Sequence, residues 1–339
     1  MGRITLSAKA SFPLPACVRT KDPGGSSIFA APSAIGNSPA RFRSGQANPV
    51  LGLMLHRPSL GVLPPPDKTM PVLTQPADLP SIEKLREQEL DEARAIQSVM
   101  LPGQPLRTDC VVVSHEFQPA AEVGGDYLDY FLLPDGMIGL YLGDVCGKGL
   151  PAALYAALAV GTLRGVHKTG QAPAKVLSFL NERLLLRGII RRYSTIQYAL
   201  FDSLRAQMRI ASAGMLGPLL IRGNECRALQ LAGFPPGLYS GVTYDEFTLD
   251  LVPGDSVLFC TDGLTDARNV HGQEFDLGGV QDVCRRHAGD SPTDLLNHVF
   301  SAIQEFSRNC RQSDDMTAAV FQYNPSPGLP AAIPQRCER

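Results

Sequence analysis

The sequence predicts an α+β protein built on antiparallel sheets. Strand-like runs come in consecutive groups, pairs of helical segments separate these groups, and turns containing Gly or Pro lie between neighbouring strands. Strands grouped in this way favour α+β architecture, whereas a parallel sheet needs strands that alternate with helices. The chain has 339 residues, of which 44% are hydrophobic, so it can bury a sizeable core.

The first helical segment is residues 81–101. Ser81 is a candidate N-cap, and a Pro-Gly pair ends the segment. Its apolar residues recur with a period of 3.6 and share one face: Ile82, Leu85, Leu90, Ala93, Ile96 and Met100. Isolated helices of this length are marginal in water. The face therefore needs a partner, either the helix's own domain or the same helix of a second chain.

A strand at 110–118 and a β-hairpin come next. The hairpin strands are the runs 127–133 and 137–142, which a Pro-Asp-Gly turn connects. Because a hairpin brings its two ends together, Asp126 and Asp144 should lie near each other.

These two aspartates are the first candidate functional residues. Each follows a glycine at the edge of an apolar segment, although Gly-Asp is also a common turn pair, so an ordinary turn remains the alternative for either one alone. Asp262 and the Asp314-Asp315 pair also lie at strand ends, far along the chain. Carboxylates held close together repel unless a cation lies between them. Oxygen-rich, sulfur-free clusters of this kind suit Mg²⁺ or Mn²⁺.

The remaining elements follow in the order that the fold class predicts. Helices are expected from 151 to about 168 and at 173–187, 277–287 and 292–309. Strands are expected at 194–202, 207–212, 218–222, 226–230, 244–251, 255–261 and 316–322.

The two ends of the chain differ from this pattern. Residues 1–75 are rich in Pro, Gly, Ser and Ala and carry eight basic but two acidic residues. Such a segment buries too little apolar surface to offset its ordering entropy, so we expect a disordered leader. A transit peptide and a mis-assigned start, with Met70 as the true start, are the alternatives. The Pro-rich segment 324–339 is expected to be a loose tail.

Composition and motif spacing exclude several classes of protein. The net charge of -2 gives no indication of nucleic-acid binding, and the longest apolar runs are too short for a membrane span. None of the eight cysteines forms a Cys-x-x-Cys pair, which predicts reduced thiols in a cytoplasmic protein. The glycine-rich run 143–149 does not have P-loop spacing. His167, His271, His287 and His298 lack partner spacing, so surface or core roles are expected for them.

A set of short motifs then points to one family. They occur in this order: VGGDYLD at 123–129, GDVCGKGLPAA at 143–153, LN at 180–181, AG at 213–214, PGD at 253–255, TDG at 261–263 and DDMT at 314–317. The set resembles the SpoIIE/RsbU-type branch of the PPM (type 2C) metal-dependent Ser/Thr protein phosphatases. This resemblance covers about residues 89–323. It implies an antiparallel β-sandwich flanked by helices on both faces at 105–323, with 81–101 as a linker or regulatory helix.

The resemblance also implies a site for two Mn²⁺ or Mg²⁺ ions. Asp144 matches the aspartate that bridges the two metals, and Val145 matches the residue that lends a backbone carbonyl. Asp262 and Asp314 match ligands of the first metal. Asp126 matches a ligand of the second metal, directly or through water, and Asp126 and Asp144 are the expected catalytic residues.

Three positions have an open role or differ from the family pattern. The counterpart of Asp315 lies either among the ligands or behind them. Cys146 stands where this branch usually has Ser, which leaves the acid for the leaving group unassigned. Met215 replaces a His that the family often has, which affects substrate contacts or core packing there but not the metals.

The implied reaction is hydrolysis of phosphoserine or phosphothreonine on a protein by metal-activated water. The implied substrate is a phosphorylated anti-anti-sigma factor of the STAS type, in a partner-switching pathway that regulates a sigma factor. A homodimer through helix 81–101 is the other expected partner. Two alternatives are a catalytically inactive pseudophosphatase scaffold and a general phosphohydrolase that acts on small phosphoesters.

Overall fold

The computed structural model describes residues 79–186 and 192–325, with the side chains of 79–81 left out. All of them belong to the unit Pro76–Arg339. The expected leader at 1–75 and most of the expected tail at 324–339 lie outside the described residues.

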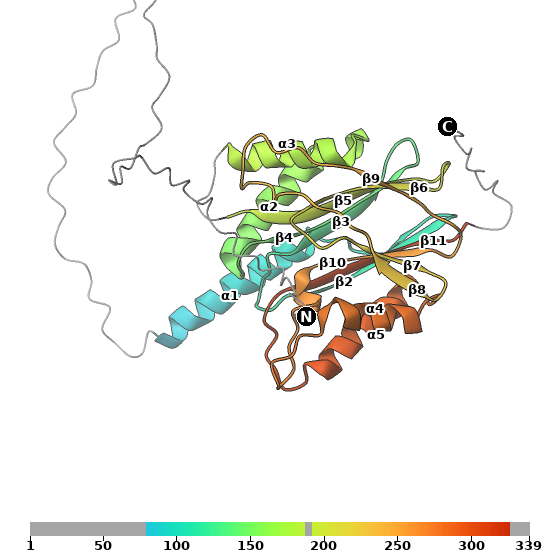
Figure 1. Cartoon of the computed structure of the whole chain (residues 1–339). Helices are drawn as coiled ribbons and strands as arrows, with labels where there is room; N and C mark the ends of the chain where they lie inside the picture. The colour runs from blue at the N-terminus through green and yellow to red at the C-terminus, as the bar shows by residue number, and fades with distance from the viewer. Residues whose placement is uncertain (1–78, 187–191, 326–339) are drawn as a thin grey trace, which may run out of the picture. The chain divides into compact units, whose positions relative to one another are not determined.

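Two antiparallel sheets form the centre of the described unit (Figure 1). The six-stranded sheet contains, in spatial order, β1 (Leu106–Arg107), β2 (Val111–Gln118), β11 (Met316–Tyr323), β10 (Ser256–Cys260), β7 (Leu219–Arg222) and β8 (Glu225–Ala228). The five-stranded sheet contains β3 (Tyr127–Leu132), β4 (Ile138–Val145), β5 (Ser194–Asp202), β6 (Gln207–Ala213) and β9 (Phe247–Asp250). The inner faces of the two sheets share one buried hydrophobic cluster. Phe201 of β5, for example, contacts Phe321 of β11 with ring centroids 5.0 Å apart.

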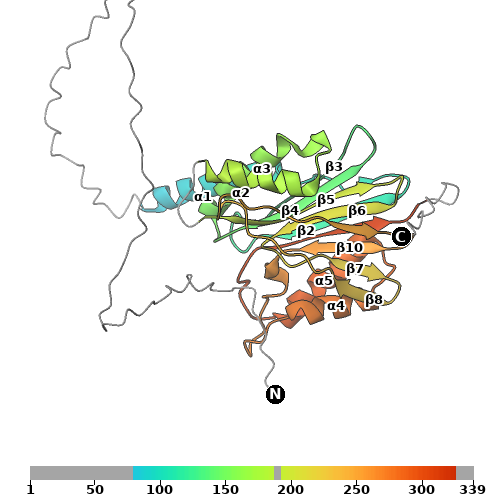
Figure 2. The ribbon, with the colours of Figure 1, turned by 45° about the horizontal axis from the view of Figure 1, so that its top comes forward.

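Helices cover both outer faces of this sandwich (Figure 2). Over the five-stranded sheet lie α2 (Leu150–Arg164) and α3 (Pro173–Leu185), whose apolar residues form a second buried cluster with that sheet. Over the six-stranded sheet lie α4 (Asp276–Arg286) and α5 (Pro292–Phe306), which form a third cluster. This architecture confirms the predicted α+β sandwich with helices on both faces. No described helix has the length and hydrophobicity needed to span a membrane.

Local sequence explains where these elements begin and end. Proline occupies the first turn of α2, α3 and α5, where its missing N–H leaves no helical hydrogen bond unmade. The hairpin of β3 and β4 forms as predicted, with Tyr127 opposite Gly143. The helix predicted from 151 to 168 instead ends at Arg164, where Gly165 follows, and a short 3-10 helix (η1, His167–Thr169) continues the chain.

The first helix differs more from its prediction. It is α1 (Leu79–Ser98), so Ser81 lies inside the helix and does not cap it. Ile82, Leu85 and Ile96 from the predicted apolar face are exposed, whereas Gln97 is buried against the domain. The helix projects from the sandwich and only its last turns contact it (Figure 1), so half of the predicted apolar face, at Ile82, Leu85 and Ile96, has no partner within the described chain.

Candidate active site

The predicted acidic residues meet at one end of the two sheets. Asp126 precedes β3 and Asp144 lies near the end of β4, so the antiparallel pairing of these strands places both at the same end. Asp262 begins the 3-10 helix η2 (Asp262–Leu264) just after β10, and Asp314 precedes β11. Since β10 and β11 are also antiparallel, their two acids share an end as well. Each sheet therefore contributes one pair of carboxylates.

Two hydroxyl groups connect the buried Asp126 to the opposite sheet. Its side chain is 2% exposed, and its Oδ2 accepts hydrogen bonds from Thr261 Oγ1 at 2.8 Å and Thr317 Oγ1 at 2.6 Å. The two threonines belong to the β10–β11 pair, where Thr261 N donates to Thr317 O at 2.9 Å. Both threonines lie within the sequence motifs at 261–263 and 314–317, which gave them no role.

The electrostatics of Asp144 show how crowded the carboxylates are. Burial raises the pKa of Asp144 to about 8, and the charge of Asp262 raises it next, ahead of Asp314 and Asp315. Burial also raises the pKa of Asp126 well above its ordinary value, and the charge of Asp144 adds to that shift. The four predicted ligands therefore act on one another, as carboxylates around one shared space do.

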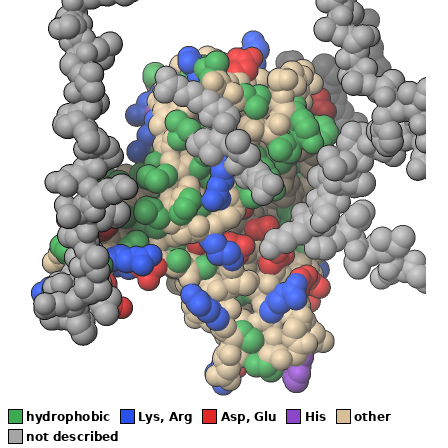
Figure 3. All heavy atoms as spheres, turned by 90° about the vertical axis from the view of Figure 1, so that its left-hand side faces the viewer, with side chains coloured by type: hydrophobic (Ala, Val, Ile, Leu, Met, Phe, Trp, Pro, Cys, Tyr) green, Lys and Arg blue, Asp and Glu red, His purple; other side chains and the backbone are tan. Residues whose placement is uncertain are grey.

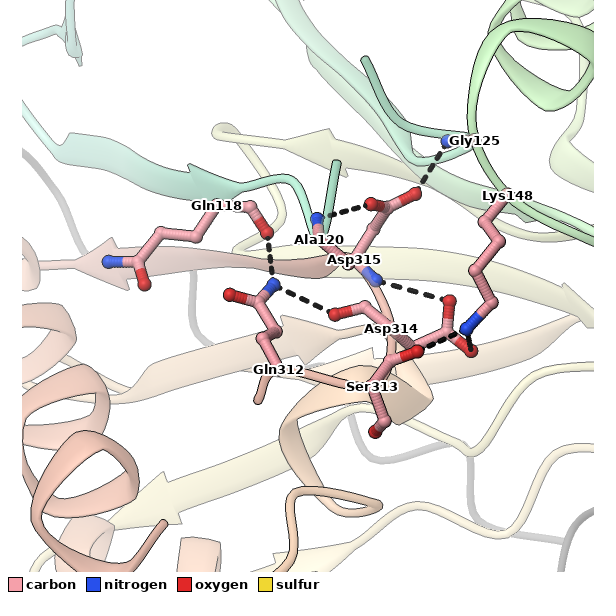
Figure 4. A network of polar contacts seen from close by, with 8 residues as sticks. All are labelled: Gln118, Ala120, Gly125, Lys148, Gln312, Ser313, Asp314 and Asp315. Atoms are coloured by element: carbon pink, nitrogen blue, oxygen red, sulfur yellow. Dashed lines mark hydrogen bonds and ion pairs between the residues drawn. The ribbon is translucent and has the colours of Figure 1, made fainter. Parts of the chain in front are cut away.

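Asp314 is the partly exposed member of the cluster, and Figure 4 shows it beside Lys148. Its side chain is 28% exposed, and its Oδ2 is 3.9 Å from Lys148 Nζ. Lys148 also donates to the carbonyl oxygen of Ser313. The loop after β4 is thus fastened to the segment before β11.

Asp315 serves a different purpose from its neighbour. Its side chain is 3% exposed, and its two oxygens accept hydrogen bonds from the backbone N–H groups of Ala120 at 2.8 Å and Gly125 at 2.6 Å (Figure 4). A Cβ added at Gly124 would lie 2.7 Å from the Asp315 carboxyl carbon, so only glycine fits there. Asp315 therefore shapes the turn before Asp126, and both of its oxygens are already engaged.

The carbonyl of Val145 faces the same turn. A Cβ added at Gly125 would lie 3.0 Å from the Val145 carbonyl oxygen. The Val145 side chain itself is fully buried in the core. The residue thus offers the cluster a backbone oxygen and no side-chain group.

Helix α1 also reaches this turn, which periodicity did not predict. Gln97 Nε2 donates to Gly124 O at 2.8 Å, and Gly124 N donates to Gln97 Oε1 at 3.0 Å. The two bonds satisfy both backbone groups of Gly124. A glutamine inside an otherwise apolar helical face is the signal that sequence offers for such a contact.

Basic side chains lie around the acidic cluster. The guanidinium of Arg192 donates to the Cys146 carbonyl oxygen, and Gly147 leaves room for it with φ of 100°. On this side of the molecule, Figure 3 shows acidic side chains gathered across the middle of the face with Lys and Arg side chains near them.

A pocket of about 300 Å³ adjoins the cluster, since Gly263 and Ser313 contribute to its wall. Three arginines also line this pocket: Arg268, Arg308 and Arg311.

The donor set fits hard divalent cations. It consists of carboxylate and carbonyl oxygens, which Mg²⁺ and Mn²⁺ prefer. Among the described residues, no three of the four aspartates have ligand atoms that all lie within 4.8 Å of one another. The four carboxylates are thus gathered at one end of the sandwich but do not close around a single point.

Comparisons with known proteins agree with this geometry. The family model described as Stage II sporulation protein E (SpoIIE) matches residues 134–324, which include Asp144, Asp262 and Asp314 but not Asp126. Phosphoserine phosphatase RsbU of Bacillus subtilis (strain 168) is 24% identical over 246 residues, which cover 72% of each chain. Phosphoserine phosphatase RsbP of the same organism is 25% identical over 232 residues, and Protein IcfG of Synechocystis sp. is 28% identical over 265 residues. These alignments cover 67% and 70% of this chain, but only 56% of RsbP and 42% of IcfG.

Solved structures show the same fold. The SiaA-PP2C domain of Pseudomonas aeruginosa matches with a TM-score of 0.65 at 23% identity, covering 72% of this chain and 98% of that one. The PP2C phosphatase domain of SpoIIE from Bacillus subtilis matches with a TM-score of 0.55 at 20% identity, covering 65% of this chain and 64% of that one. The paired sheets with flanking helices are therefore the PP2C phosphatase fold.

Proposed function

The chain belongs to the SpoIIE family of protein serine/threonine phosphatases, and from this premise we propose that it removes phosphate from phosphoserine or phosphothreonine on a protein, using two Mn²⁺ or Mg²⁺ ions. The observation that carries the proposal is the meeting of four carboxylates from both sheets at one end of the sandwich. Burial, and next the charge of Asp262, raise the pKa of Asp144, as expected for carboxylates crowded around a place that a cation would neutralise.

Each residue of the cluster has a role in this proposal. Asp144, Asp262 and Asp314 hold the ions together with Asp126 and the carbonyl of Val145. When bound, such ions lower the pKa of water and neutralise charge on phosphate oxygens. The threonine hydroxyls keep the Asp126 carboxylate fixed, and Asp315 keeps the preceding turn in place.

The surroundings of the cluster favour a protein substrate over a small phosphoester. Lys148 and Arg192 lie at its rim, and the adjoining pocket carries three arginines. Guanidinium groups suit phosphate and carboxylate partners because they donate paired hydrogen bonds. A phosphorylated, acidic polypeptide segment reaches both the cluster and this pocket, whereas a small ester fills the cluster alone.

The decisive experiment is a phosphatase assay of the Asp144→Asn variant. We expect Mn²⁺-dependent turnover of a phosphoserine protein to be abolished, because a carboxylate that would hold the ions is lost. The metal-free variant should be no less stable than metal-free wild type, since the substitution relieves repulsion. Asp135→Asn in the exposed hairpin turn is the matched control and should keep wild-type turnover.

The outcomes separate the rival functions. A wild-type rate in Asp144→Asn would refute the metal-site assignment. Wild-type protein that turns over p-nitrophenyl phosphate but no phosphoprotein would favour the small-ester enzyme. Turnover of neither substrate with Mn²⁺ would favour the inactive scaffold.

We infer a phosphorylated STAS-type anti-anti-sigma factor, acting in cytoplasmic sigma-factor regulation, as the substrate. The support is the similarity to phosphoserine phosphatase RsbU, which extends over 72% of both chains. The test is to identify the phosphoprotein that accumulates in cells without this chain. Accumulation of an unrelated phosphoprotein, with none of the STAS type, would contradict the inference.

A homodimer through helix α1 is the remaining part of the proposal. Ile82, Leu85 and Ile96 are between 51% and 63% exposed on the same side of the helix, so this apolar surface lacks a partner within the described chain. A second copy of the helix would cover it. Replacing Leu85 and Ile96 with Glu should yield a folded monomer with low activity, because dimerisation would bury charge.

Sedimentation and specific activity at several protein concentrations test this dimer. Lys84→Glu is a control, since Lys84 is exposed on another side of α1. It should sediment and turn over substrate like wild type. A monomeric wild type whose specific activity is independent of concentration would contradict the dimer.

A further inference from the structure

We propose a second metal site, for Zn²⁺, at the corner between α4 and α5. Its ligands are His287, Asp290 and His298, whose donor atoms all lie within 4.8 Å of one another. Sequence spacing gave the two histidines no common role, because eleven positions separate them along the chain. The turn between the helices brings them together.

Both imidazoles approach one oxygen of the aspartate. His287 Nδ1 lies 3.1 Å from Asp290 Oδ2, and His298 Nε2 lies 3.5 Å from the same atom. The two rings stack with centroids 3.7 Å apart and planes inclined by 16°. Two imidazole nitrogens and a carboxylate oxygen are therefore already gathered around a small common space.

The backbone fixes these positions. His287 is the residue at the end of α4, and Asp290 N donates to its carbonyl oxygen at 3.2 Å. Gly289 has φ of 100°, which lets the chain turn within this short loop. Gln322 Nε2 of β11 donates to the Asp290 carbonyl oxygen at 3.0 Å, so the loop is also tied to the sheet. His298 lies on the outer side of α5, whose inner residues are buried.

The donor set selects the kind of metal. Two imidazoles and one carboxylate suit Zn²⁺, which binds nitrogen and oxygen ligands with tetrahedral geometry, whereas Mg²⁺ prefers oxygen alone. Two ligands of a tetrahedral Zn²⁺ lie about 3.4 Å apart when each bond is about 2.1 Å. The 3.1 and 3.5 Å separations are close to that spacing. A water completes the fourth position, as in other sites with three protein ligands.

Binding requires one adjustment. The metal must lie near the plane of each imidazole, so the stacked rings must turn about their Cβ–Cγ bonds until both nitrogens point to one ion. This torsion has a broad energy profile. His298 is 46% exposed and His287 29% exposed, so both rings have room to turn.

The site is separate from the acidic cluster. Its anchor Gln322 lies near the end of β11, whereas Asp314 and Asp315 precede the start of the same strand. Gln322 lies seven positions after Asp315 along this strand, which corresponds to about 23 Å. Metal binding at the two places can therefore be measured independently.

The experiment titrates Zn²⁺ into the full chain by calorimetry, with millimolar Mg²⁺ present to occupy the acidic cluster. We expect His298→Gln and Asp290→Asn each to bind one Zn²⁺ fewer than wild type, or to bind it at least tenfold more weakly. His271→Gln is the matched control, because His271 is an exposed histidine outside the cluster, and it should titrate like wild type.

Two further measurements settle the assignment. Zn²⁺ should raise the melting temperature of wild type and His271→Gln but not of His298→Gln, and without Zn²⁺ the three should melt alike. Co²⁺ bound to wild type should give the absorption of a tetrahedral nitrogen and oxygen site with no thiolate band. Equal Zn²⁺ stoichiometry and equal affinity in wild type and His298→Gln, or a thiolate band, would overturn the proposal.

Discussion

Asp126 illustrates how a single carboxylate joins two sheets. Its Oδ2 accepts hydrogen bonds from the hydroxyls of Thr261 and Thr317 in the β10–β11 pair, while its backbone leads into β3. Burying a carboxylate is costly, and hydrogen bonds to it offset part of that cost. The residue therefore links the alignment of the two sheets to the geometry of the acidic cluster.

Replacing Thr317 with Val tests this link. Valine keeps the shape but removes one hydroxyl from Asp126, which should lower the free energy of unfolding by about 1–2 kcal/mol. Higher Mn²⁺ should be needed for half-maximal turnover, because the carboxylate is less firmly held. Urea unfolding and activity against Mn²⁺ concentration measure the two effects.

Thr248→Val is the control for this substitution. Thr248 is exposed on β9, and valine suits strands, so the change should be nearly neutral. If Thr317→Val behaves like Thr248→Val in both measurements, Asp126 does not depend on the Thr317 hydroxyl.

At the residue scale, the sequence predicted which aspartates lie close together better than it predicted which way each side chain points. Hairpin register was enough to bring Asp126 and Asp144 together. The resemblance assigned Asp314 to the ligands but left Asp315 open, because successive side chains of an extended chain point to opposite sides and the sequence alone does not show which side faces the cluster. Only the packed loop at Ala120 and Gly125 shows that Asp315 faces away from the shared space.

Helix α1 contacts the loop before Asp126 through two polar side chains, Arg94, which donates to the Glu122 carbonyl oxygen, and Gln97. The two hydrogen bonds of Gln97 hold Gly124, two residues before Asp126. Any change in the position of this helix must therefore move or release the turn. The periodic pattern located the apolar residues of α1 but could not show which neighbours the helix meets, so a buried glutamine was not foreseen.

The substitution Gln97→Ala should reduce turnover several-fold. It leaves the backbone groups of Gly124 without their partners, at a cost of about 1–2 kcal/mol in the free energy of unfolding. Gln88→Ala, at an exposed position on the same helix, should change neither quantity. Kinetics and urea unfolding of both variants provide the comparison, and equal turnover in the two would show that α1 does not support the turn.

Most other elements were predictable because local signals coincide with tertiary packing. The strand at 194–202 has its predicted bounds, and the helix at 292 begins at a proline after a capping serine. The predicted bounds were wrong where the end of a helix depends on the structure that packs next to it, as for α2, which ends at Arg164.

The carboxylates that the two sheets bring together affect the folding stability of the whole molecule. In the metal-free protein the pKa of Asp144 is about 8, against an ordinary value of 3.8, because of burial and neighbouring carboxylates. The folded state therefore favours the neutral carboxyl group, whereas the unfolded chain ionises it near pH 4. The associated stability is present below pH 4 and is lost as the pH rises towards 8.

Unfolding in urea with EDTA should therefore show stability falling between pH 5 and pH 8. Asp144→Asn should flatten this dependence, since it removes the titrating group. Added Mn²⁺ should restore stability at pH 8, because the ions bind the folded state. A wild-type stability that rises over this pH range in EDTA would contradict the arrangement of the carboxylates.

The position of β11 between β2 and β10 determines when the six-stranded sheet can be completed during synthesis. A ribosome makes β2 early and β11 last among the described strands, so the sheet has a gap at its middle until translation is nearly complete. Unpaired strand edges invite association between nascent chains. Asp314 emerges with the same late segment. A nascent chain that lacks β11 also lacks Asp314, so activity begins only when the sheet closes.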